Sequence, residues 1–245
     1  MRKFFLGSTA LVGLIAGPAI AADLAVKAPV YKGPSPPVVI YSWTGCYIGA
    51  NIGGGWARKS WTTTTPPPPL DLGSHTASGV VGGGQIGCDY QTGPLVLGIE
   101  GMFDGANLRG SNIPPSFPNS EDVTRIPWFG TLTGRIGYAL DRALLYVKGG
   151  GAWVRDNHEL IFVPTGVVGE TGSVTRSGWT LGGGLEYALA PNWSARIEYD
   201  YLGFGTKPVT FCRPICDDIF DIKQNIQLLV VGINYRFSYS PVANY

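Results

Sequence analysis

The chain has little charge for its length. Only 14% of its 245 residues are Asp, Glu, Lys or Arg, whereas ordinary soluble domains carry about 25%. The formal net charge is +1, which gives no support to nucleic-acid binding, because that function shows as a basic stripe. Intrinsic disorder is disfavoured as well, since 44% of the residues are hydrophobic and the net charge is low.

Long hydrophobic runs are also lacking after the first 22 residues. No later stretch reaches the ~18–20 apolar residues that a membrane-spanning helix needs, which excludes a helical membrane protein. A helical bundle is disfavoured by the 36 glycines, because each glycine in a helix interior costs about 1 kcal/mol relative to alanine. What remains is a folded, strand-rich chain that tolerates an apolar exterior.

The N-terminus has the organisation of a secretory signal peptide. Arg2 and Lys3 precede an apolar run over residues 4–20, and Ala19-Ile20-Ala21 is a small-x-small cleavage site. Residues 1–21 are therefore predicted to be removed on export; a retained membrane anchor is the alternative. Residues 22–43 are rich in proline and predict an extended periplasmic linker.

From residue 44 onward, apolar and polar residues alternate in a period of two. Long connections of about 20 residues alternate with short ones between these segments. This order indicates consecutive antiparallel hairpins with every long loop at the same end. Short periplasmic turns and long external loops are typical of an up-and-down membrane barrel. The eight predicted strands cover residues 44–57, 78–90, 94–104, 127–139, 143–154, 177–189, 192–203 and 223–237.

Alternation alone does not say which face meets lipid. In residues 192–203, for example, Trp193 and Ile197 share one face and Glu198 lies on the other. Aromatic residues near the strand ends, mixed charges on the polar face and segments long enough to cross hydrocarbon all favour an apolar face that points outward. The predicted aromatic girdle comprises Trp56, Trp128, Trp153, Trp179 and Trp193.

Four short motifs carry a family resemblance. Residues 43–49 (WTGCYIG), 83–87 (GGQIG), 134–139 (GRIGYA) and 232–237 (GINYRF) resemble the small outer-membrane β-barrel family of Gram-negative bacteria, in its RopB-like and opacity-type branch, often labelled porin family. The resemblance implies an all-β, eight-stranded antiparallel up-and-down transmembrane β-barrel over residues 44–237, located in the outer membrane at the cell surface. It implies no catalytic residues, and we expect no metal site and no cofactor.

The last strand carries a predicted assembly signal. Barrels of this family usually finish on a terminal aromatic residue that the barrel-assembly machinery reads, and Phe237 fits that role, although residues 238–245 follow as a C-terminal extension. The predicted signal comprises Leu229, Val231, Ile233, Tyr235 and Phe237.

Charged residues on the polar face form the main candidate functional cluster. The lumen of an eight-stranded barrel is just wide enough for side chains to fill it, so these charges predict a paired network that plugs the barrel; a gated ion path is the alternative. The predicted interior charges are Glu100, Arg135, Lys148, Glu186, Arg196, Glu198 and Arg236.

The four cysteines predict disulfides in an exported chain. Cys212 and Cys216 flank three residues in the last long loop, where no histidine lies nearby to favour a metal site. Cys46 and Cys88 occur at positions where the family usually has aromatic residues, and their joint replacement suggests cross-strand pairing. Two free thiols acting as small apolar side chains are the alternative.

Three functions are compatible with this barrel. The first is a structural and surface-interaction role with a side-chain-filled lumen, in contact with outer-membrane lipid, lipopolysaccharide and a host or surface ligand through the long loops. The second is a narrow porin-like channel for small solutes or ions. The third is a lipid-modifying enzyme built on His75 with Ser74, or on His158 with Ser173.

Overall fold

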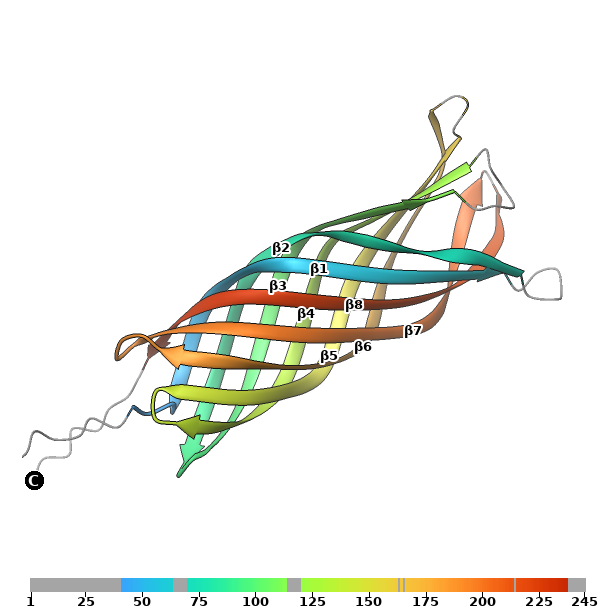
Figure 1. The fold of residues 1–245 in the computed structure, drawn as a ribbon. Coiled ribbons are helices and arrows are strands. Elements are labelled where there is room, and N and C mark those ends of the chain that lie inside the picture. Colours follow the sequence, from blue (N-terminus) through green and yellow to red (C-terminus); the bar gives the residue numbers. More distant parts are fainter. Residues whose placement is uncertain are drawn as a thin grey trace, which may run out of the picture. The chain divides into compact units, whose positions relative to one another are not determined.

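A computed structural model describes residues 41–63, 70–113, 120–162, 164, 166–213 and 215–237 (Figure 1). The predicted signal peptide, nearly all of the predicted linker and the C-terminal extension lie outside these ranges. Among the described residues, no helix has the length and apolarity that crossing a membrane requires.

The described chain forms a closed barrel in which every strand pairs antiparallel with its neighbours in sequence. The first and last strands pair with each other and close the cylinder, as Figure 1 shows. The predicted eight-stranded up-and-down barrel is therefore confirmed. The strands are β1 (Gly45–Thr63), β2 (Leu70–Thr92), β3 (Leu95–Asn112), β4 (Ser120–Leu140), β5 (Ala143–Phe162), β6 (Val167–Ala188), β7 (Trp193–Arg213) and β8 (Ile215–Phe237).

The prediction of long loops of about 20 residues is wrong. Most of each predicted loop continues the strand ladder, so that β7 and β8 are separated by a single residue between Arg213 and Ile215. Serine, threonine and charged residues in these segments resemble loop formers in sequence. They fit strands here because the outer face of the sheet beyond the membrane meets water rather than lipid, while the ladder hydrogen bonds continue.

Apolar side chains point away from the barrel axis over one part of its length. Val231 is 51% exposed, whereas Glu198 on the neighbouring strand is 1% exposed. Leu229 and Ile233 are exposed in the same way, and Arg236 is fully buried. The barrel therefore has the inside-out arrangement of a protein whose outer wall is solvated by lipid.

The apolar wall covers only about half of each strand. Its outward side chains run from Ile48 to Trp56 on β1 and from Trp193 to Tyr201 on β7, close to the ~9–11 residues that a tilted strand needs to cross hydrocarbon. Above the level of Trp56, Trp153 and Trp179 the strands continue to the end of the barrel that lies opposite the short turns. Short turns face the periplasm in such barrels, so this opposite end faces the cell exterior. We call this part of the barrel the outer extension.

Candidate functional site

A tryptophan closes the periplasmic mouth of the barrel. Trp43, which the sequence pattern assigns to the linker, is fully buried. Its indole Nε1 donates to the carbonyl of Asp141 over 3.2 Å, and its backbone N–H donates to Gln91 over 2.8 Å. The Arg236 guanidinium lies 5.3 Å from the centroid of the same ring and donates to the Trp43 carbonyl.

Above this cap lies a first group of buried charges centred on Arg135. Its Nε donates to Asp89 over 2.7 Å and its Nη1 to Glu186 over 3.2 Å. Arg236 donates to the same Asp89 over 2.8 Å. Ser194 and Asn234 donate to Glu186 over 2.5 and 2.9 Å, which satisfies its second oxygen.

A second group of buried charges is centred on Lys148. Its ammonium donates to Glu198 over 2.6 Å and to Glu100 over 3.1 Å, and Arg196 also binds Glu100. The hydroxyl of Tyr47 donates to Glu100 over 2.7 Å, and that of Tyr146 donates to Glu198 over 2.6 Å. The Arg135 guanidinium stacks over both rings, 4.8 and 5.1 Å from their centroids, and so joins the two groups.

The structure places all seven predicted interior charges in these two groups. The predicted set left out four buried acids, Asp89, Asp104, Asp156 and Asp200. All four share the inward alternation of their strands, which is the signal that could have identified them. Asp89 is the main partner of both Arg135 and Arg236, and Asp200 lies 3.5 Å from the Lys148 ammonium.

An apolar layer fills the barrel above the charges, and the sequence pattern did not predict it. On β5, for example, the inward side chains pass from Lys148 to Ala152 and Val154 and then to Asp156. Gly178 of β6 leaves space for the Phe204 ring, because a Cβ there would come within 2.8 Å of it. The layer comprises Ala57, Ala77, Val81, Met102, Leu108, Ile126, Phe129, Ala152, Val154, Leu202, Phe204, Ile226, Leu228 and Val230.

A third group of charges closes the lumen within the outer extension. Asp156 accepts from Lys59 and from Gln224, each over 3.1 Å, and lies 3.1 Å from the Arg176 Nε. Arg176 also donates to the carbonyl of Ile222 over 2.8 Å. Burial lowers the pKa of Lys59 to about 8, although the Asp156 carboxylate counteracts that effect.

The two histidines also lie in the outer extension, but neither predicted serine–histidine pair is formed. His75 points toward the interior and Ser74 away from it, because successive strand residues face opposite sides. His158 is buried, with Nδ1 3.4 Å from the Thr124 hydroxyl, whereas Ser173 is exposed and accepts from Arg155 over 3.0 Å. Burial lowers the pKa of both histidines, so each is neutral near pH 7.

A disulfide joins Cys46 of β1 to Cys88 of β2, which are directly opposite partners in the ladder. Both face outward near the periplasmic end of the wall. Because β1 pairs with β8 to close the barrel, the disulfide links this closing strand covalently to its other neighbour, β2. The side chains of Cys212 and Cys216 lie outside the described part of the structure.

Loss of this disulfide is expected to destabilise the barrel without changing its fold. Replacing both cysteines by alanine should lower the free energy of unfolding by about 2–4 kcal/mol, because the unfolded chain loses a cross-link. Urea unfolding in lipid vesicles measures the change, and dithiothreitol treatment of the wild type should reproduce it. Equal stability of the oxidised and reduced proteins would contradict this prediction.

The predicted girdle residues occupy two levels of the wall. Trp193 lies at the periplasmic level, where its ring contacts Tyr235 with centroids 5.1 Å apart. Trp56, Trp153 and Trp179 are exposed at the outer level, and Trp128 is half-buried there beside Phe103, 5.6 Å away. The proposed assembly residues of β8 lie on its outward face and end at Phe237; their recognition by the assembly machinery stays a prediction.

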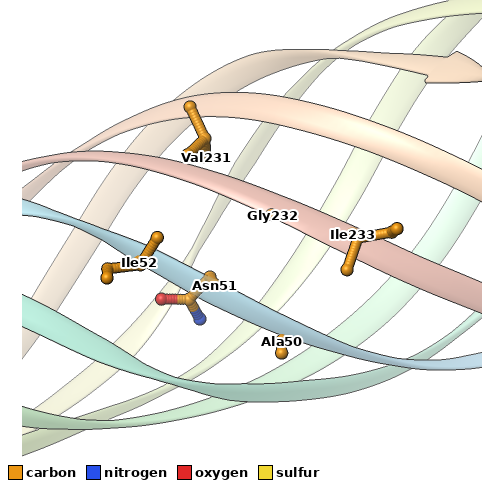
Figure 2. A pocket seen from close by; sticks show the side chains of 6 residues that line it. All are labelled: Ala50, Asn51, Ile52, Val231, Gly232 and Ile233. Carbon is orange, nitrogen blue, oxygen red and sulfur yellow. The ribbon is translucent and has the colours of Figure 1, made fainter.

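The grooves lined by described residues open on the outer wall. One lies over the seam where β1 meets β8 and is lined by Ile52, Val231 and Ile233, with Ala50 and Gly232 leaving it shallow. Figure 2 shows this groove from nearby. In the described part of the structure, no cluster of three or more His, Cys, Asp or Glu side chains is placed to hold a metal ion.

The sequence is similar to curated outer-membrane proteins over nearly its whole length. It is 33% identical over 249 residues to a 31 kDa outer-membrane immunogenic protein of Brucella melitensis biotype 1, covering 97% of this chain and 100% of that one. A 25 kDa outer-membrane immunogenic protein of Brucella abortus is 28% identical over 243 residues, covering 97% and 99%.

Two solved structures are similar to much of this chain at low sequence identity. Neisserial surface protein A is 15% identical, with a TM-score of 0.41 and coverage of 79% of this chain and 98% of that one. OprG from Pseudomonas aeruginosa is 12% identical, with a TM-score of 0.44 and coverage of 79% and 96%. The model of the outer membrane protein beta-barrel domain family matches residues 10–237. The chain therefore belongs to this family of outer-membrane β-barrel proteins.

Proposed function

We propose that this protein is a non-conducting structural and surface-interaction protein of the outer membrane. The apolar layer inside the barrel is the observation that carries the proposal. It lies between the Lys148 group and the Asp156 group, so an ion that crossed the lumen would pass three sets of paired charges and a segment lined mainly by apolar side chains, in which Asp104 of β3 lies opposite Phe129 of β4. Trp43 adds a further obstruction at the periplasmic mouth.

The energetics of this arrangement favour a sealed lumen over a conducting channel. An unpaired charge in an apolar environment loses its hydration without compensation, and Phe129 and Leu228, both fully buried, occupy that region of the lumen. Opening a path would also separate buried ion pairs, which costs several kcal/mol for each partner left unpaired. The interior charges therefore serve best as a stabilising network.

The outer extension supports a role at the cell surface. It continues the strands beyond the apolar wall, so that the outer faces of these strands meet lipopolysaccharide and any host or surface ligand. Serine and threonine are frequent on those outward faces, as at Ser60, Thr76 and Thr175. The two Brucella relatives are named as immunogenic proteins, which fits a surface-exposed barrel.

A role without catalysis is supported by the positions of the histidines. Each histidine points inward, while the serine predicted to accompany it points outward on the same sheet. Catalysis by such a pair needs direct contact between the two side chains.

Planar-bilayer recording tests this proposal. The purified wild-type barrel is expected to give no stable conductance steps. Steps that appear in the wild type and change in size when Phe129 or Arg135 is replaced by alanine would show that ions pass through the lumen, and would overturn the proposal. A contaminating porin is recognised because its steps are unaffected by either substitution.

A further inference from the structure

Three arginines lie side by side on the outer wall of β3, β4 and β5. Arg109 and Arg125 are directly opposite partners in the ladder. Arg125 is in turn opposite Asn157, and Arg155 is the next outward-facing residue along β5 toward the membrane. All three side chains point away from the barrel axis, because their neighbours in sequence Leu108, Ile126 and Val154 are buried inside. We call them the arginine cluster.

The cluster has no acidic partner within the described residues. Arg109 donates to Asn107 over 2.8 Å and Arg155 to Ser173 over 3.0 Å, both neutral acceptors. Like charges directly opposite each other in a sheet are destabilising. The nearest acid on this face, Glu159, is opposite Val123, farther from the membrane, and forms no ion pair with the cluster. The arrangement therefore has an excess of positive charge that an external anion would neutralise.

The height of the cluster on the wall identifies the anion. Arg155 is directly opposite Trp128, and Trp153 is the next outward residue below it. Exposed tryptophans mark the boundary between hydrocarbon and headgroups. The cluster thus lies at the level of the lipid headgroups, where phosphate is the anion that planar guanidinium groups bind with two hydrogen bonds each.

An apolar groove runs below the cluster on the same strands. It has a volume of about 380 Å³ and is floored by Gly134 and Gly149, with Leu97, Ile136, Val147 and Leu181 among its walls. A similar groove lies on the β1–β8 seam (Figure 2), where two outward cations, Arg58 and Lys223, lie above it in place of three arginines. The arginines rather than the groove therefore distinguish this sector of the wall.

We propose that the arginine cluster and the groove beneath it form a binding site for a phosphorylated lipid of the outer leaflet. Its phosphate is held by Arg109, Arg125 and Arg155, and one acyl chain lies over Gly134 and Gly149. A barrel that conducted ions could carry the same site, so this inference does not depend on the proposed function.

Lipid A binding to the folded barrel in dodecyl maltoside tests the site, with bound lipid counted by native mass spectrometry. The double variant Arg109→Gln/Arg125→Gln is expected to bind bisphosphorylated lipid A at least tenfold more weakly than the wild type. The matched control Arg142→Gln/Lys207→Gln removes the same charge from the periplasmic β4–β5 turn and from β7, away from both grooves, and should change binding less than twofold. Lipid A stripped of its phosphates should bind both variants and the wild type equally.

Thermal unfolding separates this result from a folding defect. Without lipid A, the double variant should unfold at the same temperature as the wild type or a higher one, because the repulsion between Arg109 and Arg125 is removed. Adding lipid A should raise the unfolding temperature of the wild type alone. If the double variant does not fold, the single variant Arg155→Gln provides the same comparison.

Two results would overturn the inference. Equal losses of lipid A in the double variant and its control would show a general charge effect rather than a site. Full competition by millimolar inorganic phosphate would show that the cluster binds free anions and that the groove contributes nothing.

Discussion

Replacing Lys148 by methionine is expected to lower the free energy of unfolding by about 3–5 kcal/mol, because removing one member of a buried ion pair leaves its partners uncompensated. Lys148 contacts Glu100, Glu198 and Asp200 at 3.1, 2.6 and 3.5 Å. All three carboxylates are at most 1% exposed, so water cannot replace the lost ammonium. Urea titration of the barrel in lipid vesicles, followed by tryptophan fluorescence, measures the change.

A surface lysine provides the matched control. Lys207 donates to Ser177 over 3.2 Å in an exposed position, so Lys207→Met should change stability by less than about 0.5 kcal/mol. Adding Glu198→Gln to Lys148→Met should recover part of the loss, since it removes one of the unpaired carboxylates. A Lys148→Met barrel as stable as the wild type would show that the interior charges do not act as a network.

Replacing Gly150 by alanine is expected to destabilise the barrel by at least about 1–3 kcal/mol, the usual cost of overpacking an interior. A Cβ at this inward position would lie 2.1 Å from the carbonyl oxygen of Leu132 and 2.8 Å from the Cα of Thr133. Both contacts are with the backbone of β4, so a side-chain rotation cannot relieve them. Heat-modifiable gel migration and urea unfolding report the loss of the closed barrel.

An outward glycine separates this steric effect from a general loss of glycine. Gly101 lies on the lipid face of β3, and a Cβ there would meet nothing within 4 Å. Gly101→Ala should leave stability unchanged or raise it, because glycine weakens a strand interior. Similar behaviour of the two variants would mean that close backbone approach at Gly150 does not limit the curvature of the barrel.

Alternation, together with the aromatic residues near the strand ends and the mixed charges on the polar face, was enough to predict the wall of this barrel. Leu229, Val231 and Ile233 are separated by single residues that face inward, and the same period recurs in all eight strands. A strand between lipid and a narrow lumen exposes its two faces to different media. The alternation of period two therefore shows which side chains meet lipid and which meet the lumen. The paired charges of the lumen followed from the same alternation.

The outer extension could not be predicted in the same way. Outside the membrane both faces of a strand can carry polar residues, and the contrast between them fades, so segments such as the one containing Lys59 and His75 resemble loops. Their cross-strand pairing is visible only in the structure. The apolar layer was missed for a related reason, because inward residues such as Leu228 and Val230 lie beside outward Leu229 and give a continuous hydrophobic run.

The sequence by itself determined the number and order of the strands, their antiparallel pairing and the face that meets lipid, because these depend on the local period, on the spacing of turns and on where aromatic and charged residues lie along each strand. Only the tertiary structure decided which inward side chains meet. Arg135 reaches Asp89 across 46 positions of sequence and Glu186 across 51, and both contacts depend on the stagger of the strands around the closed cylinder. That stagger is a property of the whole barrel, set by closure between β1 and β8, and no single strand encodes it.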